Sequence, residues 1–148
     1  MIRFIKKVGR MILSGWDRKP RPYEETVMQS VLQILSPEDQ KVLQEQFNAR
    51  ERIQRSNEDR MVIYGFEDRD ALPKMSSLDE DYCLARVALK GGAGAVSVCL
   101  MSHKGVLSSM EFAKSPTGFG ENPVTVRWVK AGNQHSGYSS SIDAEEHE

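Results

Sequence analysis

The chain has 148 residues, of which 28% are charged and 39% are hydrophobic, and its formal net charge is −1. These values are typical of one globular domain. The sequence also argues against a membrane-spanning helix, because no segment approaches the roughly 18 consecutive apolar residues that such a helix needs. It also excludes a disulfide-rich scaffold, because Cys83 and Cys99 are the only cysteines. Without a CxxC pair they indicate no zinc or thioredoxin-like site, and we expect reduced thiols buried in strands.

The charge is divided unevenly along the chain. The first 22 residues contain seven Lys or Arg and one acid, so this segment carries about +6 while the remaining residues carry −7. Charge asymmetry of this kind bears on partners and not on the fold.

Residues 2–16 are predicted to form a basic amphipathic helix that ends near Trp16, because Pro20 and Pro22 favour extended backbone before them. Such a helix can pack on its own domain, or it can lie on an anionic membrane surface or another partner. The residues expected to contact a partner or an anionic surface are Arg3, Lys6, Lys7, Arg10, Trp16, Arg18, Lys19 and Arg21.

The N-terminal segment contains no apolar run of the length that a secretory signal requires. It resembles a mitochondrial transit peptide only weakly, because serines are scarce. We therefore expect a cytoplasmic location, with a peripheral position at the inner face of a membrane as the alternative.

Two helices are predicted next. Residues 23–35 show apolar positions at i, i+4, i+7 and i+8 from Val27, which is helical spacing. Ser36 is a suitable N-cap for a second helix, with Pro37 at its first position and two acids in its first turn. This helix is predicted to run from residue 37 to about residue 56, with one thin apolar stripe.

From residue 61 onward the apolar pattern alternates with period two, which predicts strands. Gly105 is expected at a positive φ in a three-residue hairpin, 103–105. On the solvated face of the sheet, Leu107 and Met101 are expected to form an exposed apolar patch. The expected strands are residues 61–66, 84–89, 95–102, 106–113 and 124–128.

The predicted fold class is α+β, with N-terminal helices packed on one face of an antiparallel β-meander of about four or five strands. The predicted organisation is a basic amphipathic segment (1–22), an α+β domain (23–131) and a disordered polar tail (132–148).

No motif in the chain indicates a catalytic, metal or cofactor site. The glycine-rich residues 91–94 do not open a helix, as a dinucleotide site would require, and no P-loop is present. The acidic residues between 67 and 81 lack calcium-loop spacing. His103 could act as a general base only beside a partner. Candidates for that partner are Glu111, Ser108, Ser109 and Cys99.

The sequence therefore predicts a small soluble, non-catalytic binding or adaptor protein that engages a protein partner. The alternatives are peripheral membrane association through the N-terminal helix, and a small enzyme with a cleft between sheet and helices. Nucleic acid is not expected, because the body is acidic and its basic residues do not interleave with aromatics. No small-molecule ligand is indicated.

Overall fold

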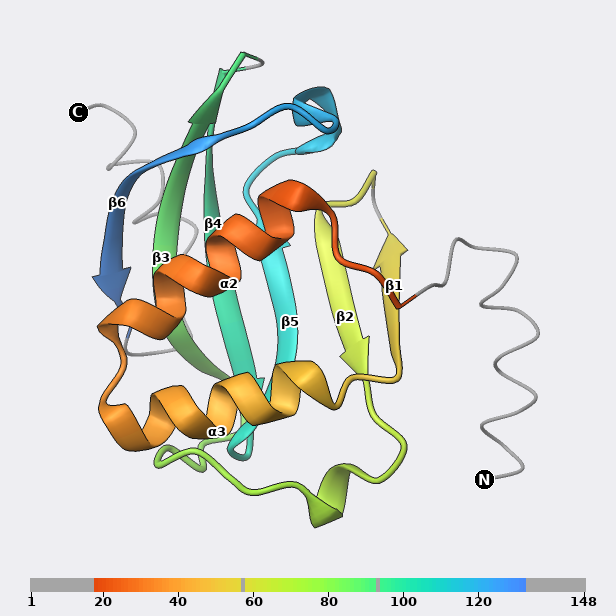
Figure 1. Cartoon of the computed structure of the whole chain (residues 1–148), viewed down its shortest axis with the longest axis vertical. Coiled ribbons are helices and arrows are strands. Elements are labelled where there is room, and N and C mark those ends of the chain that lie inside the picture. The colour runs from red at the N-terminus through yellow and green to blue at the C-terminus, as the bar shows by residue number, and fades with distance from the viewer. Residues whose placement is uncertain (1–17, 57, 93, 133–148) are drawn as a thin grey trace.

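The computed structural model describes residues 18–56, 58–92 and 94–132. In this part of the chain two helices lie across one face of a six-stranded antiparallel sheet (Figure 1). The predicted α+β architecture is confirmed, with one strand more than expected. The helices are α2 (Pro22–Ile34) and α3 (Pro37–Asn48), and the strands are β1 (Arg52–Ser56), β2 (Met61–Gly65), β3 (Tyr82–Gly91), β4 (Gly94–His103), β5 (Val106–Phe112) and β6 (Thr125–Ala131).

The strand order is β1-β2-β5-β4-β3-β6. Strands β3, β4 and β5 follow one another through hairpins and form the predicted meander. The β1–β2 hairpin adds beside β5, and β6 returns beside β3. The β4–β5 turn consists of two residues and not three, because Lys104 and Gly105 both adopt positive φ, at 52° and 85°.

The prediction that the second helix reaches residue 56 is wrong, because α3 ends at Asn48 and residues 52–56 form β1. Burial in β1 alternates, with Ile53 and Arg55 facing the helices. The strand pairs with β2 along its whole length. Glu58 and Asp59 adopt positive φ in the turn between them. Pairing with β2 therefore overrides the local helical pattern.

The hydrophobic core fills the space between the helices and the inward face of the sheet. Each buried aliphatic or aromatic side chain contributes about 1.5–3 kcal/mol through loss of apolar surface from water. Tyr23 of α2 meets Phe112 of β5 edge to face, with ring centroids 5.6 Å apart. Fully buried side chains from both layers include Val27, Val31, Val87, Leu89, Val98, Leu100 and Met110.

Gln46 fastens α3 to the sheet from inside the core. Its Nε2 donates to the carbonyl oxygens of Pro73 (2.7 Å) and Gly105 (2.9 Å), and its Oε1 accepts from the Leu107 N–H (2.8 Å). Leu107 is fully buried, so the exposed position predicted for it is wrong. A register shift between Met101 and Ser102 interrupts the alternation there and turns both Val106 and Leu107 inward.

A buried ion pair joins the start of α2 to β1. Arg55 donates from Nε to Glu24 Oε2 (2.8 Å) and from Nη2 to Glu24 Oε1 (2.7 Å). Glu24 also accepts from the Arg21 backbone N–H (2.9 Å), which satisfies the N–H of the N-cap residue of α2. The side chains of Arg55 and Glu24 are only 3% and 0% exposed, so the pair lies out of water.

Because two buried tyrosines lie near this ion pair, we expect the protein to lose stability at alkaline pH. Burial and the Glu24 charge raise the pKa of Tyr64, and burial together with Glu24 and Asp59 raises the pKa of Tyr23 from 10.0 to about 12. Above pH 10 the tyrosines ionise in the unfolded chain but stay neutral in the folded one, so stability is expected to fall as the pH rises. Each contributes a slope of about 1.4 kcal/mol per pH unit.

Tyr64→Phe is expected to remove one tyrosine's share of that slope. At neutral pH the variant should match the parent within about 1 kcal/mol, because the Tyr64 hydroxyl is buried with no hydrogen-bond partner among the described residues. Urea unfolding between pH 9 and 11 measures both quantities. If the free energy of unfolding fell with pH equally in the variant and the parent, Tyr64 would not contribute to the slope.

Candidate functional site

The candidate site is the face of the sheet opposite the helices. Among the described residues, no helix or strand packs on this side, whereas α2 and α3 both lie on the other (Figure 1). We call it the open face, and its side chains include Ile63, Cys83, Arg86, Ala88, Ser97, Cys99, Met101, Ser109, Glu111, Trp128 and Lys130.

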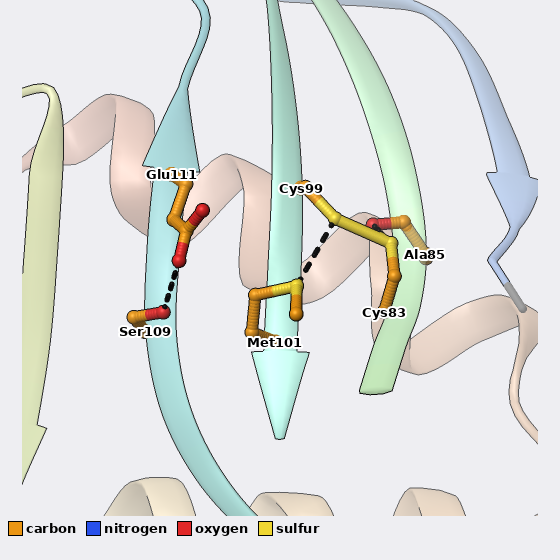
Figure 2. The surroundings of a disulfide bond; sticks show 6 residues. All are labelled: Cys83, Ala85, Cys99, Met101, Ser109 and Glu111. Carbon is orange, nitrogen blue, oxygen red and sulfur yellow. Dashed lines mark hydrogen bonds between the residues drawn. A yellow bond between two sulfur atoms is a disulfide. The ribbon is translucent and has the colours of Figure 1, made fainter. Parts of the chain in front are cut away.

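A disulfide between Cys83 and Cys99 lies at the centre of the open face (Figure 2). The prediction of reduced thiols is therefore wrong, although both residues are fully buried in strands as expected. Cys99 pairs across the ladder with Arg86, and Cys83 with Met101, so the two cysteines are diagonal neighbours with Cα atoms 6.3 Å apart. A separation of sixteen residues gives no sign of this; the β3–β4 register decides it.

Close neighbours surround both sulfur atoms. Met101 Sδ lies 3.4 Å from Cys99 Sγ, and the Ala85 carbonyl oxygen lies 3.5 Å from Cys83 Sγ (Figure 2). Gly132, which follows β6, lies against Cys83, and a Cβ atom at this position would be 2.7 Å from Cys83 Sγ. Its N–H donates to the Leu84 carbonyl at 3.0 Å. Only glycine fits this approach without displacing the chain.

Three charged side chains lie in one row across the open face. The ladder places Glu111, Cys99, Arg86 and Lys130 next to one another on β5, β4, β3 and β6. Glu111 accepts a hydrogen bond from Ser109 Oγ at 2.9 Å (Figure 2). Lys130 Nζ lies 5.2 Å from the centroid of the Trp128 ring.

Two shielded polar atoms on the open face lack partners. Arg86 Nε and Ser97 Oγ are both out of contact with water, and neither has a hydrogen-bond partner among the described residues. Such groups are uncommon in folded proteins and call for a structural explanation. Arg86 pairs with Cys99 across the ladder, and Ser97 lies two residues before Cys99 on β4, on the face that no described helix covers.

The middle of the open face is built from small uncharged side chains. Ala88, Ser97, Cys99 and Ser109 are at most 7% exposed. A solvated sheet face normally carries long polar or charged residues. Ile63, which is 43% exposed on β2, and the half-buried Trp128 on β6 bound this floor. Met101, predicted to be exposed here, is half-buried beside the disulfide.

The predicted basic contact residues are described only in part. Arg18 and Lys19 have exposed side chains, and Arg21 forms an ion pair with Asp59 at 3.3 Å. The predicted contact residues in the N-terminal helix (Arg3, Lys6, Lys7, Arg10 and Trp16) lie outside the described residues. Their role in contacting a partner stays a prediction.

The backbone of residues 18 and 19 is attached to the domain. The Arg18 carbonyl accepts from Arg50 Nε and the Lys19 carbonyl from Arg55 Nη2, both at 3.1 Å. The segment that leads to α2 is therefore attached through its carbonyl groups to Arg55 of β1 and to Arg50 just before that strand.

The residues considered for acid–base chemistry do not assemble. His103 lies at the turn end of β4, half-exposed, with Nδ1 3.8 Å from Asp81. Cys99 is four residues from it along the strand, about 13 Å at strand spacing, and is bonded to Cys83. Glu111 is five residues along β5 from Val106, the partner of His103 in the ladder. The structure thus provides no support for the enzyme alternative at these residues.

A hollow of about 460 Å³ lies between α3 and residues 73–76. No helix of the described residues could cross a membrane. No family model, curated protein or solved structure matches this chain, so its fold and open face are the basis for any functional proposal.

Proposed function

We propose that this chain is a non-catalytic binding protein that docks a protein partner on its open face. The observation that carries the proposal is the floor around Cys99, where small uncharged side chains surround the shielded and unpartnered Arg86 Nε and Ser97 Oγ. Burial of aromatic and aliphatic side chains at its rim would supply most of the binding free energy.

The partner expected is a protein segment with apolar side chains and at least one carboxylate. Trp128 and Ile63 offer apolar contacts at opposite ends of the floor. The half-buried Arg86 side chain has guanidinium N–H groups besides the shielded Nε, and these can donate to a carboxylate. An ionised acceptor gives the stronger hydrogen bond. The Glu111 carboxylate, which accepts from Ser109, would repel a second acid near β5. A partner's carboxylate is therefore expected on the side of Arg86, which gives the partner an orientation.

The cytoplasm stays the predicted location. A persistent disulfide is more typical of oxidising compartments, so Cys83–Cys99 does not itself support that prediction. The membrane alternative depends on the basic N-terminal segment, including Arg18, Lys19 and Arg21. It stays a prediction, because residues 1–17 of that segment lie outside the described residues.

Ile63→Lys tests the proposal, with Ile34→Lys as the matched control. Both isoleucines are exposed, at 43% and 39%, but Ile63 lies on the open face and Ile34 at the end of α2. The tagged parent and the control are expected to recover the same cross-linked protein from native extract. Ile63→Lys is expected to recover at least about tenfold less, the loss that about 1.4 kcal/mol of binding free energy produces.

Titration of the purified partner against the three proteins then gives the dissociation constants directly. Equal affinity for Ile63→Lys and the parent would contradict docking on the open face. If Ile34→Lys weakened binding of the partner as much as Ile63→Lys does, the contact would not be specific to the open face.

A further inference from the structure

The disulfide on the open face is sealed by the end of the edge strand. Both cysteines are 0% exposed, so a reductant cannot reach either sulfur atom in the closed structure. On the side of Cys83 the neighbour is Gly132, where an added Cβ would meet first the Cys83 carbonyl oxygen and then Cys83 Sγ, the latter at 2.7 Å. On the side of Cys99 the neighbour is Met101 Sδ, at 3.4 Å.

The cover on Cys83 belongs to an edge strand. Among the strands of the described residues, β6 pairs with β3 alone and stands at one end of the strand order. Gly132 is attached to β3 by the hydrogen bond from its N–H to the Leu84 carbonyl, at 3.0 Å. Ends of edge strands open at low free-energy cost compared with the centre of a sheet. The seal over Cys83 is therefore the part of the site that can open.

We propose that Cys83 and Cys99 form a reversible redox site that a dithiol reduces, and that the end of β6 at Gly132 is its gate. One thiolate of the dithiol attacks Cys83 Sγ, the Cys83–Cys99 bond breaks, and Cys99 leaves as a thiolate that takes up a proton. The second thiol of the reductant then displaces Cys83 as a thiol and closes the reductant's own disulfide. Two electrons and two protons pass to the protein.

Reduction acts back on the gate. Two thiol sulfur atoms cannot remain at bonding distance, so they must move apart when the bond is broken. Met101 limits the movement of Cys99, and Gly132 stands against Cys83. Separation of the sulfur atoms therefore presses on Gly132 and weakens its hydrogen bond to Leu84. Opening of the gate and reduction of the disulfide favour each other, as linkage requires.

The inference does not depend on the proposed function, because it is tested on the full-length chain alone. The oxidised protein is mixed with dithiothreitol, and free thiols are followed by alkylation and mass measurement. Gly132→Ala is expected to be reduced at least about tenfold faster than the parent, equivalent to about 1.4 kcal/mol in favour of the open gate.

Gly92→Ala is the matched control, since a Cβ at Gly92 meets nothing within 4 Å, and its rate should equal that of the parent. A second measurement needs no variant: exchange of the Gly132 amide proton in the oxidised and the reduced parent, expected to be faster in the reduced form. Equal reduction rates for Gly132→Ala and the parent, unchanged Gly132 exchange, or two free thiols after exposure to oxidant would each overturn the proposal.

Discussion

Arg55→Met is expected to lower the free energy of unfolding by about 3–5 kcal/mol, because it leaves the Glu24 carboxylate buried without its partner. Arg55 supplies two hydrogen bonds to Glu24, at 2.8 and 2.7 Å, and Glu24 has no exposure to water. The pair also joins α2 to β1, so its loss affects both elements. Unfolding in guanidinium chloride, followed by circular dichroism, measures the change.

The double variant with Glu24→Leu and Arg55→Met is the control for that result. It removes both charges, and replacement of a complete buried pair by apolar residues is often neutral in stability. We expect it to recover most of the loss, apart from the hydrogen bond that Glu24 accepts from the Arg21 N–H. A double variant no more stable than Arg55→Met would show that shape, and not the unpaired charge, causes the loss.

Gln46→Glu is expected to destabilise the protein by on the order of 3 kcal/mol, because it buries an unpaired charge. The new carboxylate could still accept from the Leu107 N–H, but its other oxygen would face the carbonyl oxygens of Pro73 and Gly105 that Gln46 now binds at 2.7 and 2.9 Å. Chemical unfolding at pH 7 measures the loss.

Gln46→Met separates this repulsion from the loss of hydrogen bonds. It leaves the same backbone groups without partners but adds no charge, so we expect a smaller loss than with glutamate. The difference in free energy of unfolding between Gln46→Glu and Gln46→Met should become smaller as the pH falls. Protonation of the glutamate removes its charge and restores one hydrogen-bond donor. A deficit independent of pH would contradict this account.

The elements with strong local signals could be predicted from the sequence. Ser36 caps α3 as expected, accepting from the Asp39 N–H at 3.3 Å, and the apolar spacing from Val27 gave a helix close to α2. Strand β1 could not be predicted in this way. Its two inward residues are the apolar Ile53 and the charged Arg55, and Arg55 is placed there by Glu24, 31 residues earlier in the sequence.

The open face was predicted as a surface but not in its details. Alternation assigned Met101 to it correctly, whereas the register shift after Met101 moved Leu107 into the core. The Cys83–Cys99 bond depends on how β3 and β4 align, which sequence spacing does not give. Gly132 was assigned to a solvated tail, and the last strand was predicted to end at residue 128. β6 instead continues to Ala131 and brings Gly132 against Cys83.

The β1–β2 hairpin is attached to the rest of the sheet by a short seam. β2 pairs with β5 only over residues 61–63, whereas β3 and β4 pair over nearly their whole lengths. When the hairpin detaches, the backbone edge of β5 becomes available to the β2 strand of another copy. Strand exchange between molecules is therefore the route by which this protein is expected to self-associate on heating. The Glu24–Arg55 ion pair opposes it, together with the buried Ile53, Val62 and Tyr64 of the hairpin.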